Sequence, residues 1–290
     1  MTKQNFESPS GLVEIDMVYF KRKSFLRDGG ANMGRLILIT NDDGIDAGGI
    51  RQLAETAKAF GEVWVVAPES QRSGKSHSVT YLEPLYVRER PGYMDGVKAY
   101  ECSGVPVDCV RVGIHLLGRK PDVVLSGINS GYNISGDIQY SGTAGAALEA
   151  AFWGIHAIAL SQANLDYHPV TDRYLRELIG EYIDKPLPQN TVWNINFPGC
   201  APEDCKGVKH AAPFRRMILH GQLHLQNTRG RHGGIHGRAR QKLARQRRHR
   251  PWRSVRQLRR RRHCDECAII KTYRFCTCSL KSQKQVLFYF

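Results

Sequence analysis

Short apolar runs that alternate with helix-like segments are the feature that most constrains the fold of this chain. The runs are residues 36–39, 63–67, 122–125, 157–160 and 191–196. The segments between them carry apolar residues at helical spacing, and they are residues 49–60, 108–117, 142–153 and 171–183. Strands that alternate with helices of this length predict a parallel sheet covered by helices on both faces. We therefore expect an α/β domain with a mainly parallel sheet.

The positive charge of the chain is confined to its C-terminal quarter. The 290 residues include 42 Lys and Arg against 27 acidic residues, a net charge of +15. Residues 217–290 hold 19 of the basic and two of the acidic residues, so this tail carries +17 and residues 1–216 carry −2. The tail has no sustained apolar period, and we expect it to be disordered.

This basic tail raises an alternative to an enzyme. Its Lys and Arg residues could contact nucleic-acid phosphates non-specifically, although the segment lacks a recognisable binding fold. A non-enzymatic interaction protein, or a nucleic-acid-binding protein that acts through the tail, is therefore the alternative function. Metal-dependent phosphate release would distinguish an enzyme from either.

The hydropathy pattern excludes a membrane helix. No stretch approaches 18 consecutive apolar residues, which is the length that spans a bilayer. The first residues also lack the basic, apolar and small-residue pattern of a secretory signal. We expect a cytoplasmic protein with reduced cysteines and no membrane partner.

Polar segments follow the predicted strands at the edge where parallel sheets carry their active sites. They are residues 41–44, 69–76, 126–133 and 140–143. Asp42 and Asp43, with hydroxyl and amide oxygens from the other segments, predict an all-oxygen site that suits Mg²⁺ or Mn²⁺. Ser141, Gly142 and Thr143 begin a predicted helix, whose N-terminus can bind an anion. A divalent cation that faces an anion site indicates hydrolysis of a phosphate ester.

Each of these segments also has an ordinary structural interpretation. Asp-Asp-Gly is a common turn, and Thr143 could be a helix cap. Residues 73–76 resemble the end of a P-loop, but the leading glycine of that motif is missing. The functional interpretation gains weight because all four segments converge on one sheet edge.

Five segments, in order, resemble the SurE family of survival proteins, which are 5′/3′-nucleotidases. They are residues 37–45, 66–68 with 71–74, 104–110, 126–133 and 140–147, and residues 194–198 also fit. The resemblance implies a Rossmann-like three-layer domain, placed here at residues 33–216, that hydrolyses nucleoside 5′-monophosphates, with 3′-monophosphates as further candidates. It also implies one divalent cation per subunit, either Mg²⁺ or Mn²⁺, and assembly as a homodimer or homotetramer.

The family's site residues can be carried over to matching positions. The metal ligands would be Asp42, Asp43, Ser73 and Asn129. Candidates for contact with the substrate phosphate are Asn41, Gly74, Asn129, Ser141, Gly142 and Thr143. Asp42 and Asp43 are also the catalytic candidates, because one of them would position or deprotonate an attacking water. An aspartyl-phosphate intermediate is the alternative mechanism.

The N-terminal segment does not fit the resemblance. The family begins just before its first strand, which corresponds to Met33. Gly29 and Gly30 can be encoded by a ribosome-binding sequence at suitable spacing from that codon. We hypothesise that Met33 is the start and that residues 1–32 are a non-native leader, with a genuine extension as the alternative.

The tail departs more sharply. A SurE-like chain should continue into an extended arm used for assembly, but this sequence becomes rich in Arg, His and Cys. Back-translation with the frame shifted forward by one nucleotide after Met217 gives strand-like alternation, acidic turns and a stop codon. We hypothesise that residues 217–290 are out of frame, which puts the family's oligomeric assembly in doubt for this chain.

Overall fold

The computed structural model describes residues 12–15, 34–210 and 269–274, and the first and last of these ranges are described as backbone strands alone. The elements are β1 (Leu12–Ile15), β2 (Leu36–Thr40), α1 (Gly48–Ala57), β3 (Glu62–Pro68), β4 (Leu85–Glu89), β5 (Val97–Cys102), α2 (Pro106–Leu117), β6 (Val123–Ser130), η2 (Ser135–Tyr140), α3 (Gly142–Phe152), β7 (His156–Gln162), α4 (Pro169–Tyr182), β8 (Thr191–Phe197), η3 (Pro202–Asp204), β9 (Lys209–His210) and β10 (Ile269–Arg274). Strands and helices alternate as the apolar pattern predicts.

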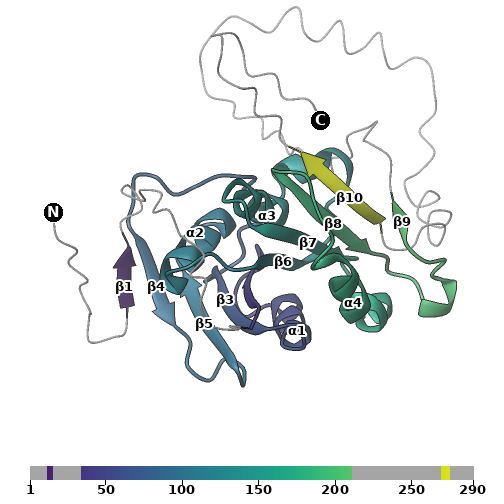
Figure 1. Cartoon of the computed structure of the whole chain (residues 1–290), viewed down its shortest axis with the longest axis horizontal. Coiled ribbons are helices and arrows are strands. Elements are labelled where there is room, and N and C mark those ends of the chain that lie inside the picture. The colour runs from purple at the N-terminus through teal and green to yellow at the C-terminus, as the bar shows by residue number, and fades with distance from the viewer. Residues whose placement is uncertain (1–11, 16–33, 211–268, 275–290) are drawn as a thin grey trace, which may run out of the picture.

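The described strands form one sheet in the order β1-β4-β5-β3-β2-β6-β7-β8-β10-β9. Neighbouring strands from β5 to β8 in this order are parallel. Strand β4 is antiparallel to β5, and β10 is antiparallel to β8. Figure 1 shows β1 at one side of the molecule and β9 at the other, with the parallel strands between them. The mainly parallel sheet predicted from the sequence is confirmed.

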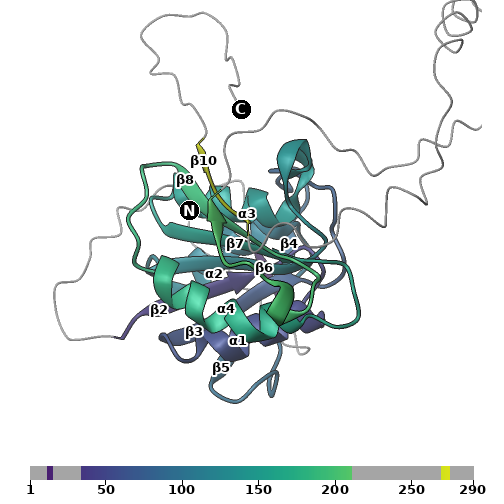
Figure 2. The ribbon, with the colours of Figure 1, turned by 90° about the vertical axis from the view of Figure 1, so that its right-hand side faces the viewer.

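Helices cover both faces of the sheet and make a three-layer domain. Helices α1 and α4 pack on one face, and α2 and α3 pack on the other (Figures 1 and 2). Every residue of β2 and of β8 is buried, as expected for strands enclosed on both sides. The two apolar layers hold the central strands in place, and the carboxyl ends of those strands lead into the segments that carry the candidate site.

Strands β4 and β5, which lie between β3 and α2 in the sequence, were not predicted. In β4 and β5 buried residues are mixed with exposed charged ones, so neither strand reads as an apolar run. Strand β6 is also longer than predicted, because it continues through Ser130 with a register shift between Ser126 and Asn129. The predicted loop 126–133 is therefore partly a strand, and its polar residues lie on the sheet rather than beyond it.

The terminal segments contribute backbone to the sheet edges. Within the tail that we expected to be disordered, six residues form β10 beside β8, so the expectation does not hold for them. The rest of residues 217–290 lies outside the described residues. Strand β1, from the segment expected to be a leader, pairs with β4. Within the described ranges, no helix has both the length and the apolar character needed to cross a membrane.

The packing of α1 on the sheet provides a test of the core. We expect Leu53→Ala to lower the free energy of unfolding by about 2–5 kcal/mol, because this side chain is fully buried in the α1 and α4 layer. Urea denaturation at fixed pH measures the change. Glu55→Ala, at an exposed position of the same helix, should change the free energy by less than about 0.5 kcal/mol. Equal losses in the two variants would contradict this account of the core.

Candidate metal and phosphate site

The segments that follow β2, β3 and β6 meet at the carboxyl edge of the sheet. The backbone N–H of Arg72 donates to the carbonyl oxygen of Asp42 at 2.7 Å. The backbone N–H of Ser130 donates to Oδ2 of Asp43 at 2.9 Å. These bonds tie the second and third segments to the paired aspartates, so the predicted convergence is present in the structure.

Asp42 is the buried member of the pair, with 3% of its surface exposed. The hydroxyl of Thr143 donates to its Oδ1 at 2.5 Å. Helix α3 can come this close because position 142 is glycine, and a Cβ there would lie 3.0 Å from the Cβ of Asp42. Burial raises the pKa of Asp42 to about 6, although the Thr143 hydrogen bond lowers it, and the charge of Asp43 raises it further.

Asp43 is partly exposed and held by two other segments. Besides the bond from Ser130, the side-chain amide of Gln71 lies 3.5 Å from its Oδ1. Burial raises the pKa of Asp43, and the bonds from Ser130 and Gln71 oppose that shift. In the described part of the chain, the hydrogen-bond partners of both aspartates are neutral groups. Two adjacent, poorly solvated carboxylates with neutral partners favour a cation between them.

Ser73 lies beside these carboxylates, and Asn129 directly precedes Ser130, whose backbone N–H binds Asp43. The Gln71 amide that approaches Asp43 also donates to Oγ of Ser73 at 3.1 Å, which places the exposed hydroxyl beside the pair. Asn129 is almost buried, and its side-chain NH₂ donates to the carbonyl oxygen of Gly131 at 2.7 Å. That bond orients the amide so that Oδ1 is the atom it can offer to a ligand.

The four predicted metal ligands therefore supply carboxylate, hydroxyl and amide oxygens from neighbouring strand ends. This donor set suits a hard divalent cation such as Mg²⁺ or Mn²⁺. The raised pKa of Asp42 points the same way, because a cation would offset the unfavourable charge of a buried carboxylate. The residues present fit the metal that the resemblance implies.

The first residues of helix α3 form hydrogen bonds within the protein at this site. Ser141, not Thr143, is the cap of α3: its Oγ accepts a hydrogen bond from the N–H of Ala144 at 3.0 Å. The Thr143 hydroxyl is bound to Asp42. The positive end of α3 is therefore directed first at the Asp42 carboxylate. Contact of Ser141, Gly142 or Thr143 with a phosphate stays a prediction.

The two remaining candidates also stay predictions. The NH₂ of Asn41 donates to the carbonyl oxygen of Gly44 at 2.8 Å, so this side chain braces the turn after β2. Its Oδ1 is buried and has no hydrogen-bond partner in the described part of the chain. Gly74 has a φ of +74°, which favours glycine at the tip of the loop after β3.

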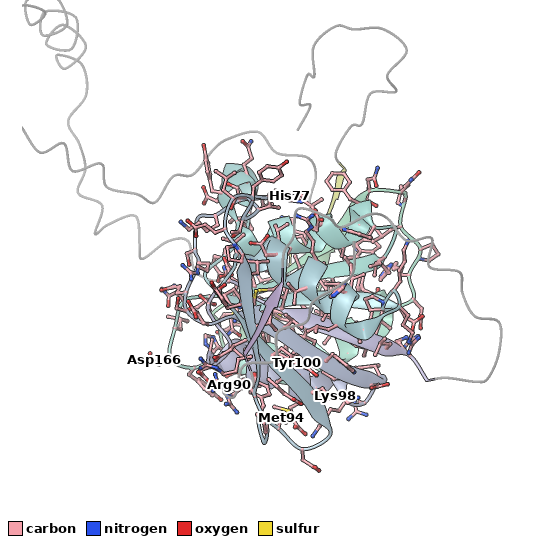
Figure 3. All side chains as sticks on the ribbon, turned by 90° about the vertical axis from the view of Figure 1, so that its left-hand side faces the viewer. His77, Arg90, Met94, Lys98, Tyr100 and Asp166 are labelled. Atoms are coloured by element: carbon pink, nitrogen blue, oxygen red, sulfur yellow. The ribbon has the colours of Figure 1, made fainter. Side chains whose placement is uncertain are left out.

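One contact of the site was not predicted. His77 (Figure 3) lies 2.8 Å from Oε2 of Glu149 on helix α3, through its Nε2. The backbone of the same loop also touches α3, because a Cβ at Gly145 would lie 2.3 Å from the carbonyl oxygen of Ser76. The loop that carries Ser73 is thus fixed to α3. The partners are 72 positions apart, and no sequence pattern connects them.

The His77 and Glu149 contact leads to a prediction about pH. Burial raises the pKa of Glu149, but hydrogen bonds from His77 and Trp153 and the charges of His77 and Arg111 outweigh it, so the pKa is lowered from its ordinary 4.5. A lowered pKa stabilises the fold at higher pH, and this contribution is lost as the pH falls through the folded-state value. Glu149→Gln should therefore reduce the loss of unfolding free energy between about pH 5 and pH 3.

Urea denaturation at a series of pH values measures this dependence. Glu55→Gln, at an exposed position of α1, is the comparison variant, and Glu149→Gln should change the slope more than this variant does. A Glu149→Gln variant with the slope of the parent chain would contradict the assignment.

Comparison with known proteins places this fold and site in a family. The family model described as "Survival protein SurE" matches residues 37–219. A 5′-nucleotidase SurE of Brucella abortus (strain S19) is 44% identical over 188 residues, covering 61% of this chain and 71% of the relative. A 5′-nucleotidase SurE of Methylocella silvestris is 43% identical over 192 residues, covering 63% and 74%.

A solved structure agrees with these relatives. The crystal structure of the SurE protein from Aquifex aeolicus has a TM-score of 0.56 and 36% sequence identity, and the match covers 62% of this chain and 73% of that one. The family model alone spans more than half of the present sequence. On these grounds the chain belongs to the SurE family.

Proposed function

We propose that this protein is a 5′-nucleotidase, which hydrolyses nucleoside 5′-monophosphates to a nucleoside and inorganic phosphate. Two observations support the proposal. Relatives that are 43–44% identical carry the name 5′-nucleotidase SurE. The observation that carries it is the meeting of Asp42 and Asp43 with oxygen donors from two other strand ends. Nucleoside 3′-monophosphates present the same kind of ester and are proposed as secondary substrates.

In this proposal Asp42, Asp43, Ser73 and Asn129 hold one divalent cation per subunit, Mg²⁺ or Mn²⁺. When bound, the cation neutralises charge on the phosphoryl oxygens and acidifies a water molecule at the site. The protein holds the donors in place through the bonds from Thr143, Ser130 and Gln71 described above. These bonds fix the donors before substrate arrives, which reduces the reorganisation needed during the reaction.

The two aspartates have different roles in the proposed reaction. Asp42 is nearly buried and fixed by Thr143, so its role is to hold the cation. Asp43 is partly exposed, and solvent water can reach it. We therefore assign to Asp43 the positioning of the attacking water and the acceptance of its proton. The N-terminus of α3 adds positive potential on the side where the phosphate enters.

We expect Asp42→Asn and Asp43→Asn each to reduce phosphate release from AMP by at least about 100-fold, because each removes a charge that the cation and the water need. Phosphate release is measured with Mg²⁺ or Mn²⁺ present, and EDTA should abolish it in the parent chain until either ion is restored. Asp184→Asn is the control, since Asp184 pairs with Arg35 just before β2, at the opposite edge of the sheet. Parent-level activity in either site variant would overturn the proposal.

We further propose that the chain natively starts at Met33 and is out of frame from about Met217. The match to the family model ends at residue 219, close to the proposed frame change. Strand β10 does not require a selected sequence, because an open sheet edge accepts any extended backbone. The basic tail then has no selected function, and its contacts with nucleic acid are non-specific. We place the protein in the cytoplasm and propose that a chain with its native arm forms a homodimer or homotetramer.

The gene sequence tests the frame change. We expect an inserted or missing base near the codon of Met217 when codons 210–225 are sequenced from an independent template. The corrected frame should encode an arm with acidic turns instead of the Arg-rich tail. An unchanged frame would show that the tail is made, and the proposal would be wrong.

A further inference from the structure

An aromatic side chain stands on the strand-end segment that supplies Asn129. Tyr132 is three residues beyond this candidate metal ligand, and the backbone is held on both sides of it. Before it, the Ser130 N–H is bound to Asp43. After it, the Asn133 N–H donates to Oδ1 of Asn196 at 2.9 Å. The position of the Tyr132 ring is therefore tied to the paired carboxylates.

The side chain of Tyr132 reaches across the end of the sheet. Its hydroxyl accepts a hydrogen bond from the backbone N–H of Gly199, just after β8, at 3.1 Å. Strand β7 lies between β6 and β8, so the ring extends over the end of β7. Tyr132 is still 42% exposed. The bond from Gly199 holds the side chain in this position, so its exposed surface offers the aromatic ring to a ligand.

A second apolar side chain packs on Gly199, the residue that Tyr132 binds. Leu165, on the segment after β7, is 51% exposed. Its Cδ1 would be 2.5 Å from a Cβ on Gly199, so it packs on the residue that binds Tyr132. The neighbouring Asn164 accepts a hydrogen bond from the Ser130 hydroxyl, which links this segment to the metal site. The next residue, Asp166, lies at the edge of the molecule in Figure 3.

The spacing suits a nucleotide. Strands in a sheet are about 4.8 Å apart, so the ends of β6 and β8 are separated by about 10 Å. A phosphate held at Asp42 and Asp43 would leave the ribose over β6 and β7, with the base near Tyr132 and Leu165. An exposed aromatic ring binds bases by stacking, and it tolerates all of them because every base has a π face.

We propose that Tyr132 and Leu165 form the subsite that binds the nucleobase of the substrate. The inference rests on the proposed nucleotidase function. It assigns a binding site to the base, which is the part of the substrate beyond the sugar phosphate. The subsite recognises an aromatic base through its face, not through hydrogen bonds to its edge. Purine and pyrimidine nucleotides are then both substrates.

AMP and ribose 5-phosphate provide the test, because they share the sugar and the phosphate and differ in the base. In the full-length chain, Tyr132→Ala should lower kcat/KM for AMP by about tenfold, within the 5- to 150-fold expected from the loss of stacking. It should change kcat/KM for ribose 5-phosphate by less than about twofold. Where turnover of ribose 5-phosphate is too slow, its Ki as a competitor of AMP replaces kcat/KM.

Three further variants separate the contribution of the ring from other effects. Tyr132→Phe keeps the ring and loses the bond to Gly199, so it should retain most of the preference for AMP, and it also serves if Tyr132→Ala does not fold. Tyr86→Ala removes a tyrosine of the same exposure, 42%, on the distant strand β4, and it should leave both substrates unaffected. Tyr140→Ala tests another exposed tyrosine, at the start of the segment that leads into α3.

The outcomes distinguish the two proposals. An equal loss on AMP and ribose 5-phosphate in Tyr132→Ala, or no loss on either, would overturn the subsite while the nucleotidase function stands. So would a loss specific to AMP in Tyr140→Ala but not in Tyr132→Ala. A parent chain that releases no phosphate from AMP in the presence of Mg²⁺ or Mn²⁺ would overturn the proposed function, and the subsite with it.

Discussion

The buried carboxylate of Asp42 is the group on which the arrangement of the site depends. A charged side chain with 3% exposure at the end of a central strand is unfavourable unless nearby groups compensate it. The compensation comes from α3, through the Thr143 hydroxyl and the positive end of the helix. It is incomplete, because the pKa of Asp42 is still raised to about 6. A bound divalent cation would supply the rest, so the local instability of the carboxylate and its affinity for metal have the same cause.

Helix α3 can serve this carboxylate because its side chains are small. Nine of its residues are buried, and most are Gly or Ala. Gly142 lets the helix approach Asp42, and Gly145 lets the loop after β3 approach the same helix. The contact of His77 with Glu149 also fixes that loop to α3. One helix thus supports both Asp42 and the loop that carries Ser73, so ligands from different strands keep a constant separation.

Sequence patterns predicted the elements of this structure that have a regular apolar pattern. Buried strands and amphipathic helices have a period that can be read, and parallel strands bring their carboxyl ends together by topology. The meeting of Asp42 and Asp43 with hydroxyl and amide donors from other segments could be predicted for that reason, whereas Ser73 and Asn129 as individual metal ligands were implied by the family resemblance. The role of Thr143 could not be predicted, because a hydroxyl near a helix start fits a cap as well as a ligand, and the contact with Asp42 spans 101 positions.

Strands without a regular apolar pattern were missed, because the sequence analysis recognised strands by that pattern. Strands β4 and β5 lie outside the central part of the sheet that helices cover on both faces. They expose charged residues, so their burial pattern is irregular. The end of β6 is buried but polar, and its residues read as a loop. In each case the long-range partners of a segment, and not its own composition, decide that it becomes a strand.

The polar end of β6 leads into a hydrogen-bond network that holds the segment from Asn129 to Asn133. The NH₂ of Asn133 donates to Ser161 at 2.8 Å, and the NH₂ of Asn194 donates to the carbonyl oxygen of Asn133 at 2.8 Å. These groups are buried, and a buried polar group is costly when its partner is displaced. The loop is therefore held in one conformation between β6, β7 and β8. Because Asn129 precedes the network and Tyr132 lies within it, the sheet itself sets the distance between the proposed metal site and the aromatic ring.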